Sequence, residues 1–481
     1  MLNVSVSPIT DQAIKLFHDG CLTLSEIEEN GILIDLDYCK RQYKALTNKI
    51  RKLRKLISKE DVVKTWKRVY GKDFNINSNA QLAYIIFDYY KEPVIKETET
   101  GAPAVDKEVL HKLSKKYKFL KYLEKLRKLL KARDTYLKNI IEETSDKGLL
   151  HPIFNLHTVV TFRSSSSNPN FQNIPIRDPY IKRVIRRAFI PREGHTFGGI
   201  DYGGSEVKIA CCYHKDPVMM KYLKGAGDMH RDVAADCYKT TPDMVSKDMR
   251  YCGKNKFTFP QFYGDYYKNC AVGLWEAIDD MNLKMTDGTP VKEHLKKEGI
   301  TCLDDFIEHI RNVEDIFWNK RFKVYAQWKE QWLKDYWKNG YFDMYTGFRC
   351  QGVMGKNDVI NYPVQGASFH CLLWSLIRLH AWMKENKLKS KIVGQIHDEI
   401  VLDMYIPEAK DILLKAKDIM VNEIVKEWKW IIVPLEVDAA FCPPGKSWAD
   451  KETVFEYIGS KDEVTWSGWL KEYLDGGKVK C

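Results

Sequence analysis

Three titratable side chains stand in succession in the stretch "SKIVGQIHDEIVLD", residues 390–403. His397, Asp398 and Glu399 interrupt an alternation of apolar and polar residues, and β-branched pairs flank them on both sides. This pattern predicts two strands joined by a tight turn, with the carboxylates at the edge of a sheet. Carboxylates placed there could hold a metal ion, and the plainer alternative is a solvated hairpin tip.

A second candidate carboxylate lies in "HTFGGIDYGGSEVKIACCYH", residues 195–214. The segment begins as a strand and passes through two glycines into a helix from Ser205, so Asp201 ends the strand. If Asp201 and Asp398 lie side by side, their charges repel, and a divalent cation between them would relieve the repulsion. Oxygen ligands favour Mg²⁺ or Mn²⁺. Taken alone, an aspartate after a strand more often has a turn or capping role than a catalytic one.

Two cations stand four residues apart in "DMVSKDMRYCGKNKFTFPQFYGDYY", residues 243–267. Arg250 and Lys254 share one helical face without an acidic residue at i±4, which points to an external anion or to an ordinary solvated face. Four aromatic residues follow them. They suit either a core edge or a platform for a nucleobase: Phe257, Phe259, Phe262 and Tyr263.

The elements that must position these residues belong to a chain of 481 residues, long enough for several domains with a large core. Lys and Arg outnumber Asp and Glu by 76 to 65, and this net charge of +11 suggests a polyanionic partner. Basic residues concentrate in 49–59 and 112–138, two runs with apolar residues at helical spacing. They are expected to be amphipathic helices that bind nucleic acid, lie on a membrane surface or simply face solvent.

The cysteines and the chain start bear on location. Twelve scattered cysteines without a CxxC pair indicate neither a zinc site nor a disulfide framework, and they fit a reducing cytoplasm. The sequence shows no targeting segment and no apolar run long enough to cross a membrane. We therefore expect a soluble cytoplasmic protein of a bacterium or of a phage-infected host, with no membrane partner.

Read together, these segments resemble the family A DNA polymerases, the group that includes bacterial DNA polymerase I. "DYGGSEVKIA" is similar to motif A of that family, "RYCGKNKFTFPQFYG" to motif B and "QIHDEIVLD" to motif C, in the same order. "TFRSSSSNPNFQNIPIRDP", "NYPVQGASFH" and "VPLEVDAAFCPPGKSWADK" extend the resemblance, which covers roughly residues 15–455.

The resemblance implies an α+β right-hand fold with a palm built on an antiparallel sheet, helical fingers and a helical thumb. The expected division is a palm-side segment 1–40, thumb 41–150, palm 151–215 with motif A, fingers 216–345 with motif B, palm 346–455 with motif C and a C-terminal extension 456–481. No role is evident for the extension.

The resemblance also implies a metal centre and the residues that form it. Asp201, Asp398 and the backbone carbonyl of Tyr202 would hold two Mg²⁺ ions, which Mn²⁺ could replace. Glu399 would lie beside the metals and support catalysis, and His397 would lie near the primer terminus.

The remaining site residues follow from the same resemblance. Six residues are expected to bind the incoming nucleotide: His230, Arg250, Lys254, Glu206, Phe259 and Tyr263. Lys254 is also a candidate proton donor to pyrophosphate. Among these, Glu206 and Phe259 would exclude a 2′ hydroxyl. The residues expected to contact DNA are Arg163, Asn361 and Gln365 in the minor groove, and Asn170, Gln172, Asn173 and Arg177 along the duplex.

Two departures from the family pattern yield their own predictions. Gly203 and Gly204 stand in motif A where the family has Ser and Gln, so ribose rejection or fidelity is expected to differ. Motif B carries one extra residue after Lys254, which predicts a π-type bulge between about Lys254 and Pro260 that restores the positions of Phe259 and Tyr263. In a straight helix, their roles would pass to Thr258 and Phe262 instead.

The sequence thus predicts a DNA-dependent DNA polymerase that adds dNMPs to a primer 3′ end by a two-metal mechanism. It is expected to act as a monomer on primer–template DNA and dNTPs, without its own proofreading exonuclease, and a separate processivity or exonuclease factor is compatible with it. The rivals are an enzyme resembling single-subunit RNA polymerases and a catalytically silent nucleic-acid-binding protein.

Overall fold

The computed structural model describes residues 4–98, 101–176 and 178–477. A six-stranded antiparallel sheet forms the centre of the molecule, in the order β13-β12-β11-β6-β10-β9. Its strands are β6 (His195–Tyr202), β9 (Lys391–Ile396), β10 (Glu399–Tyr405), β11 (Val437–Phe441), β12 (Glu452–Ile458) and β13 (Glu463–Trp466). The two strands expected around the turn at Asp398 are β9 and β10, so that prediction is confirmed.

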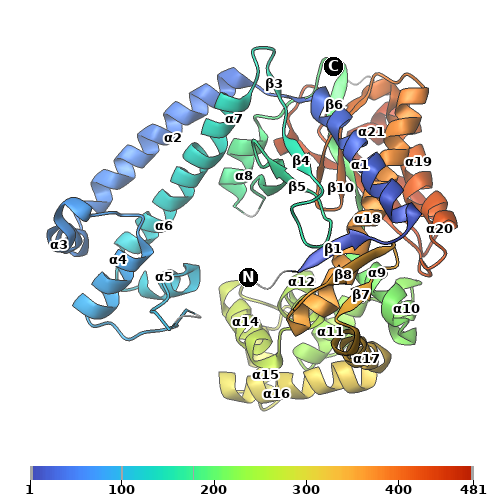
Figure 1. Ribbon diagram of the computed structural model, residues 1–481. Coiled ribbons are helices and arrows are strands. Elements are labelled where there is room, and N and C mark those ends of the chain that lie inside the picture. The colour runs from blue at the N-terminus through green and yellow to red at the C-terminus, as the bar shows by residue number, and fades with distance from the viewer. Residues whose placement is uncertain (1–3, 99–100, 177, 478–481) are drawn as a thin grey trace.

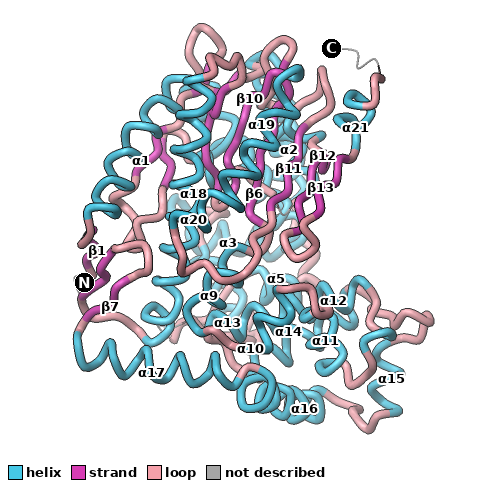
Figure 2. Tube along the Cα trace, turned by 90° about the vertical axis from the view of Figure 1, so that its right-hand side faces the viewer, coloured by secondary structure: helices cyan, strands magenta, loops and turns pink. Residues whose placement is uncertain are grey.

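Helices cover the sheet (Figures 1 and 2). The side chain of Tyr202 points toward the helices that pack on one face of the sheet, because its hydroxyl contacts Ser375 Oγ on α18 (Lys356–Glu385) and donates to the carbonyl of Met420. Neighbouring Asp201 therefore faces the opposite, open side. The helices of this part are α1 (Asp11–Asn30), α8 (Pro179–Arg186), α9 (Ser205–His214), α18 (Lys356–Glu385), α19 (Ala409–Lys417), the π-turn η9 (Asp418–Glu423), α20 (Ile424–Glu427) and α21 (Gly468–Leu474), with the short 3₁₀ turns η4 (Phe171–Asn173), η8 (Ile406–Glu408) and η10 (Trp448–Asp450).

Three small sheets join the parts of the chain. They are β1 (Ser5–Pro8), β8 (Phe348–Gln351) and β7 (Tyr341–Asp343); β2 (Ile32–Leu33) with β3 (Leu149–Leu150); and β4 (Ile153–Asn155) with β5 (Ser165–Ser167). The buried apolar residues of all parts form one continuous core.

A long helical arm projects from the sheet (Figure 1). It consists of α2 (Leu36–Ile57), α3 (Asp61–Tyr70), η1 (Gly71–Asp73), α4 (Asn79–Ala83), η2 (Tyr84–Tyr89), α5 (Lys107–Leu113), α6 (Phe119–Leu130), η3 (Lys131–Leu137) and α7 (Lys138–Glu143). The two basic runs pack against each other as α2 and α6, through apolar residues such as Leu46, Ile50 and Leu123. The prediction of one helix over 112–138 is wrong in detail, because α5 ends at Leu113 and α6 begins at Phe119.

A helical body lies below the sheet in Figure 1. It contains α10 (Pro217–Leu223), α11 (Met229–Cys237), η5 (Pro242–Met244), α12 (Lys247–Gly253), η6 (Lys254–Thr258), α13 (Phe259–Tyr263), α14 (Tyr267–Asp280), α15 (Val291–Lys297), α16 (Leu303–Ile316), η7 (Phe317–Arg321) and α17 (Lys323–Asn339). The tryptophans Trp318, Trp328 and Trp332 pack against the core. None of the described helices is both long and apolar enough to cross a bilayer.

Candidate active site

The two candidate aspartates meet at the end of the central sheet. Asp201 is the last residue but one of β6, and β10 pairs with this strand so that Glu399 lies opposite Asp201. The preceding turn is tight, since His397 has a φ of 53°, and it brings the carbonyl of Asp398 to the amide of Tyr202 at 3.4 Å. Ser205 Oγ donates to Asp398 Oδ2 at 3.0 Å. His397 is exposed, but both carboxylates of the turn are half-buried, which excludes a fully solvated hairpin tip.

Burial and crowding make Asp201 a strained carboxyl group. Burial in the first place, and the nearby charge of Asp398 in the second, raise the pKa of Asp201 to about 9. One of its oxygens, Oδ1, is buried without a hydrogen-bond partner. A buried acceptor of this kind is expensive unless a donor or a cation reaches it.

Four carboxylates form a row across the sheet. Glu399 on β10, Asp201 on β6, Asp438 on β11 and Glu456 on β12 lie directly opposite one another on neighbouring strands, so all four point to the same face. Burial, followed by the charges of Glu456 and Glu399, raises the pKa of Asp438. Sequence reasoning gave Asp438 and Glu456 no role; the only signal was an acidic residue on a strand-like segment, which says nothing about its neighbours.

The orphaned oxygen of Asp201 and the repulsion beside it fit a divalent cation. No group of three or more His, Cys, Asp or Glu within the described ranges forms a complete protein cage for a metal. Two carboxylates and a backbone carbonyl suit Mg²⁺, which takes one or two carboxylates and completes its shell with water and substrate phosphates. Asp201, Asp398 and the carbonyl of Tyr202 are therefore the residues that would hold the ions.

A buried amide fixes the turn that carries Asp398. Gln395, 2% exposed, accepts a hydrogen bond from Ser164 Oγ and one from Gln172 Nε2, the latter at 2.7 Å, and donates to the carbonyl of His397. Gln172 thereby lies beside the turn as well as along the predicted duplex path.

The cations of motif B, Arg250 and Lys254, lie close to each other and to His230. Arg250 is not unpaired as predicted, because its Nε lies 2.6 Å from Asp228 Oδ2, a residue that the i±4 rule does not search. Burial tends to raise the pKa of Asp228, but the hydrogen bonds from Arg250 and a backbone amide outweigh it and lower the value. Burial, then the charges of Lys254 and Arg250, lowers the pKa of His230 to about 4.

The predicted bulge in motif B is present. Residues Lys254–Thr258 form a π-turn between the α-helical segments Lys247–Gly253 and Phe259–Tyr263. The extra residue is absorbed there. The ring of Phe259 consequently lies 5.1 Å from Lys254 Nζ, and Thr258 and Phe262 are buried. The predicted bulge is confirmed, and because the helix is not straight, the condition under which the two roles would pass to Thr258 and Phe262 is not met.

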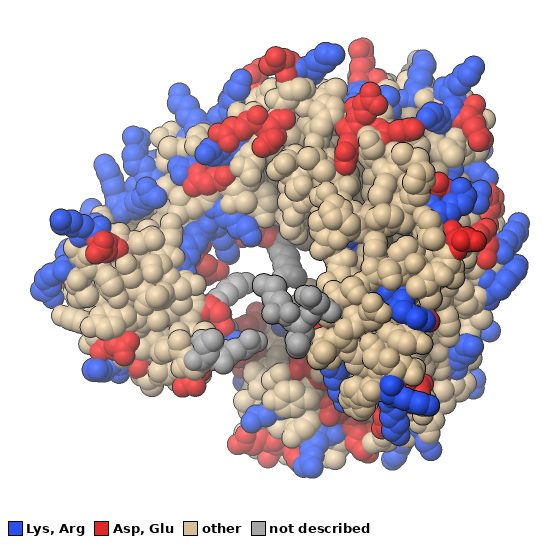
Figure 3. Space-filling model, in the orientation of Figure 1, with Lys and Arg blue, Asp and Glu red and all other residues tan. Residues whose placement is uncertain are grey.

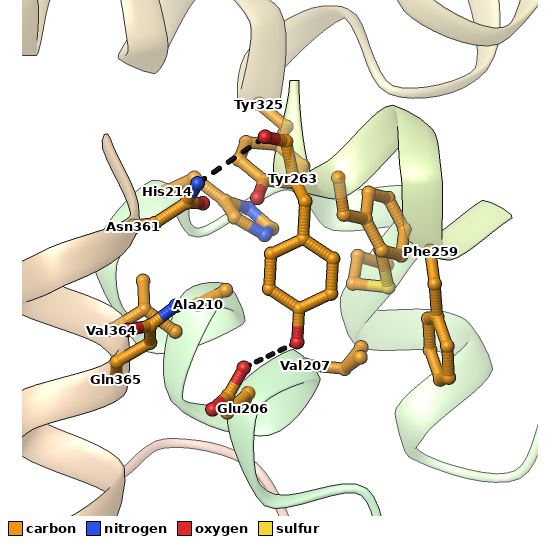
Figure 4. Close-up of a pocket in the computed structure, with 12 residues that line it drawn as sticks. Glu206, Val207, Ala210, His214, Phe259, Tyr263, Tyr325, Asn361, Val364 and Gln365 are labelled. Carbon is orange, nitrogen blue, oxygen red and sulfur yellow. Dashed lines mark hydrogen bonds between the residues drawn. The ribbon is translucent and has the colours of Figure 1, made fainter. Parts of the chain in front are cut away.

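Glu206 links the nucleotide and DNA candidates (Figure 4). Its carboxylate accepts a short hydrogen bond from the hydroxyl of Tyr263 and lies 3.3 Å from Arg163 Nη1. Burial, together with Glu206, raises the pKa of Tyr263. Asn361 Nδ2 donates to the carbonyl of Tyr263 at 3.3 Å, and Gln365 lines the same pocket. Tyr263 thus bridges Glu206 and Asn361 within this pocket.

The other polar candidates line two hollows that share Gln172 and His397, and one of the two lies against the helical arm. Arg163, Gln172, Gln365 and His397 border one of them. The second, bordered by Asn170, Gln172, Asn173 and His397, is closed on its far side by basic residues of the arm, Lys128 and Lys131. Figure 3 shows the hollow between the arm and the rest of the molecule, with blue side chains along the arm. Arg177 lies outside the described residues.

The two glycines of motif A differ in their geometry. Gly204 has a φ of 62°, in the left-handed region, and Gly203 lies close to Glu436. Lys208, 3% exposed, donates to the carbonyl of Gly203 at 2.7 Å and pairs with Glu436 at 2.8 Å. No role was expected for Lys208 from the sequence, because one of its partners is the backbone just before its own helix and the other lies in a loop far along the chain.

Comparison with known proteins places this geometry in context. Residues 37–450 match the model of DNA polymerase family A. DNA polymerase I of Caldicellulosiruptor bescii is 30% identical over 86% of this chain and 44% of its own length, and the DNA polymerase of Bacillus phage SP01 is 28% identical over 73% and 37%. The chain spans less than half the length of these curated relatives.

A solved structure supports the architecture. The polymerase domain of Pol1 from M. smegmatis, in complex with DNA primer-template and dNTP, superimposes with a TM-score of 0.70 at 24% identity, over 90% of this chain and 70% of that one. This likeness confirms the α+β right-hand polymerase fold expected from the sequence.

Proposed function

Because the chain belongs to DNA polymerase family A, we propose that it is a template-directed, DNA-dependent DNA polymerase. It adds dNMPs to the 3′ end of a primer. The observation that carries this proposal is the pairing of Asp201 with Asp398 at the end of the central sheet, together with the cationic pair Arg250 and Lys254 beside His230. One group would bind cations and the other would bind phosphates, which is what phosphoryl transfer requires.

Asp201, Asp398 and the Tyr202 carbonyl are proposed to hold two Mg²⁺ ions, or Mn²⁺ in their place. When bound, these ions would lower the pKa of the primer hydroxyl and neutralise charge on the leaving pyrophosphate. The chain prepares for this by holding two carboxylates close together in a half-buried place, where a bound cation would relieve their repulsion. Glu399 supports the pair from β10, and His397 is exposed toward the duplex path.

Arg250, Lys254 and His230 are proposed to bind the triphosphate. Arg250 must then exchange Asp228 for phosphate, which keeps the cation oriented before the nucleotide arrives. Lys254 is half-buried, and burial followed by the charge of Arg250 lowers its pKa. A lysine of lowered pKa releases its proton more readily, so Lys254 is suited to protonate pyrophosphate as it leaves.

The ribose and base would meet Glu206, Phe259 and Tyr263. Glu206 and Phe259 are proposed to exclude a 2′ hydroxyl by crowding it. Tyr263 would leave Glu206 and stack near the templating base. The residues proposed to contact the duplex are Arg163, Asn361 and Gln365 in the minor groove, with Asn170, Gln172, Asn173 and Arg177 along the path.

We assign the bodies of the fold accordingly: the arm is the thumb (41–150), the helical body the fingers (216–345), and the sheet with its helices the palm (151–215 and 346–455), with segment 1–40 on the palm side. We propose further that the protein acts as a monomer in the cytoplasm, with primer–template DNA and dNTPs as its substrates.

Primer extension tests it. Purified protein with Mg²⁺ and dNTPs should extend a primer in template order, and rNTPs should be used poorly. Asp398→Asn should reduce the rate by about a thousandfold, because several kcal/mol of charge stabilisation are lost. Asp335→Asn, a change at an exposed aspartate on α17, is the matched control. Absence of extension by the unmodified protein, or full activity of Asp398→Asn, would refute the proposal.

A further inference from the structure

Lys451 lies beside the row of four carboxylates. Its Nζ is 2.8 Å from Glu399 Oε1, and both side chains are largely buried, with 22% and 15% of their surfaces exposed. Lys451 directly follows the range that matches the family model, which ends at residue 450. The sequence motif that ends at Lys451 gave this residue no role either.

The position of Lys451 is fixed on both sides. Immediately before it, the fully buried Trp448 donates its amide to the carbonyl of Phe189, and a capping box joins Ser447 and Asp450. Immediately after it, β12 begins and pairs with β11. A lysine anchored in this way reaches Glu399 at a small cost in side-chain entropy.

No other cation within the described ranges forms an ion pair with a member of the row formed by Glu399, Asp201, Asp438 and Glu456. Arg186 also acts on Glu399 through its charge, but its guanidinium donates to the carbonyl of Pro175 and lies over the ring of Trp448. Lys451 is thus the direct counter-charge of a row whose members otherwise repel each other.

The segment after residue 451 holds this lysine in register. Strands β12 and β13 extend the central sheet, and α21 closes over them. Trp469 donates its amide to Glu452 Oε1 at 3.0 Å, Ser467 donates its amide to the carbonyl of Val454, and Leu470 is fully buried. This gives the C-terminal extension a structural purpose that its sequence did not reveal.

We propose that Lys451 is a positioning residue of the polymerase centre: it holds the Glu399 carboxylate back against the sheet and offsets one charge of the row. Asp201 and Asp398 are thereby left as the ligands for the cations. This inference rests on the proposed function. A free Glu399 would compete for the cation and alter its geometry, so the loss of Lys451 should strengthen cation binding while slowing catalysis.

The test compares three variants of the full chain. Lys451→Met removes the charge, Lys451→Arg keeps it, and Lys471→Met removes an exposed lysine of the same extension, whose ion pair with Asp475 is remote from the site. Primer extension gives kcat and the dNTP KM. Calorimetry with Mn²⁺ alone, without DNA or nucleotide, gives the affinity for the cation.

Lys451→Met is expected to lower kcat about tenfold with the dNTP KM within about twofold, the usual scale for a residue that supports a metal ligand. It should bind Mn²⁺ about fivefold more tightly, the scale for removing one unit charge near a divalent ion. Lys451→Arg and Lys471→Met should stay within about threefold of the unmodified protein in both assays. In a Glu399→Gln background, Lys451→Met should add little, because both changes break the same pair.

Unchanged Mn²⁺ affinity, additive effects with Glu399→Gln, or an equal loss in Lys471→Met would overturn the inference. The kinetic results are meaningful only if the unmodified protein extends primers. If it does not, the proposed function fails instead, and the Mn²⁺ titration still reports whether Lys451 opposes cation binding.

Discussion

Replacing Asp201 by Asn should stabilise the metal-free protein at alkaline pH, even though it should abolish catalysis. Burial and the neighbouring Asp398 raise the pKa of Asp201 from 3.8 to about 9. Between these two values the folded state binds a proton that the unfolded chain has released. The free energy of unfolding therefore falls as the pH rises through this window.

The size of the effect follows from the shift. A carboxyl group with these two pKa values lowers the free energy of unfolding by about 1.4 kcal/mol for each pH unit above 3.8. At pH 8, roughly four units higher, this amounts to about 5–6 kcal/mol before screening by solvent is considered. Asp201 is only half-buried by surface area, and screening should reduce this to about 2–3 kcal/mol. Asn has the same shape and no charge, so Asp201→Asn should recover that amount.

Urea denaturation in EDTA, followed by circular dichroism at several pH values, measures the difference. The Asn variant should be more stable at pH 8, and the advantage should shrink toward pH 5 and vanish near pH 4. Excess Mg²⁺ should reverse the order, because it binds the unmodified site and stabilises the folded state. An equal or lower stability of Asp201→Asn at pH 8, or a difference independent of pH, would refute the reasoning.

Asp305 offers a control of opposite sign. Hydrogen bonds from Thr301 and Cys302 lower the pKa of Asp305 to about 2 at the start of α16. Its contribution to stability is present above about pH 4 and is lost as the pH falls toward 2. Asp305→Asn should therefore be less stable than the unmodified protein at pH 8.

Three further predictions concern the nucleotide side of the site. Deleting Asn255 should turn the π-turn into regular α-helix and keep the rate of primer extension within about fivefold of the unmodified protein. Deleting the exposed Tyr251 should instead rotate Arg250 by about 100° around the helix axis relative to Lys254 and lower that rate more than a hundredfold. Equal losses in the two deletions would contradict the role of the bulge. Gly204→Gln should change the ratio of dNTP to rNTP incorporation. It should also lower the free energy of unfolding by about 1 kcal/mol, because residue 204 has a left-handed backbone, whereas Gly204→Asn should largely avoid this cost. An identical incorporation ratio in the two variants and the unmodified protein would refute the effect on ribose rejection. The imidazole of His230 should titrate near pH 4 by NMR in the absence of nucleotide, since burial and two cations disfavour its charged form, and a midpoint near 6.5 would show that the ring is solvated.

Local features were predictable because a few neighbouring residues decide them. The β9–β10 hairpin follows from β-branched runs around a turn, and the bulge at Lys254–Thr258 follows from one surplus residue and a proline. The break between α5 and α6 was missed, because the apolar spacing continues across Ser114–Lys118 although the helix does not.

The partners of the site residues could not be read in the same way. Asp228 reaches Arg250 across 22 positions, Glu436 reaches Lys208 across 228, and Lys451 reaches Glu399 across 52. Each contact depends on which elements become neighbours, and periodicity within one element carries no information about that.

The sequence by itself determined the kinds of chemistry available here: carboxylates at a turn and a strand end, cations on one helix face, and the motif order of a polymerase family. Only the tertiary structure decided that four carboxylates form one row, because a strand's neighbours are set by the order of strands in the sheet. Strand β6 comes from a part of the chain far from β10, β11 and β12, and the register of the four strands aligns Glu399, Asp201, Asp438 and Glu456. Repulsion within that row is a property of the fold, and so is the lysine that offsets it.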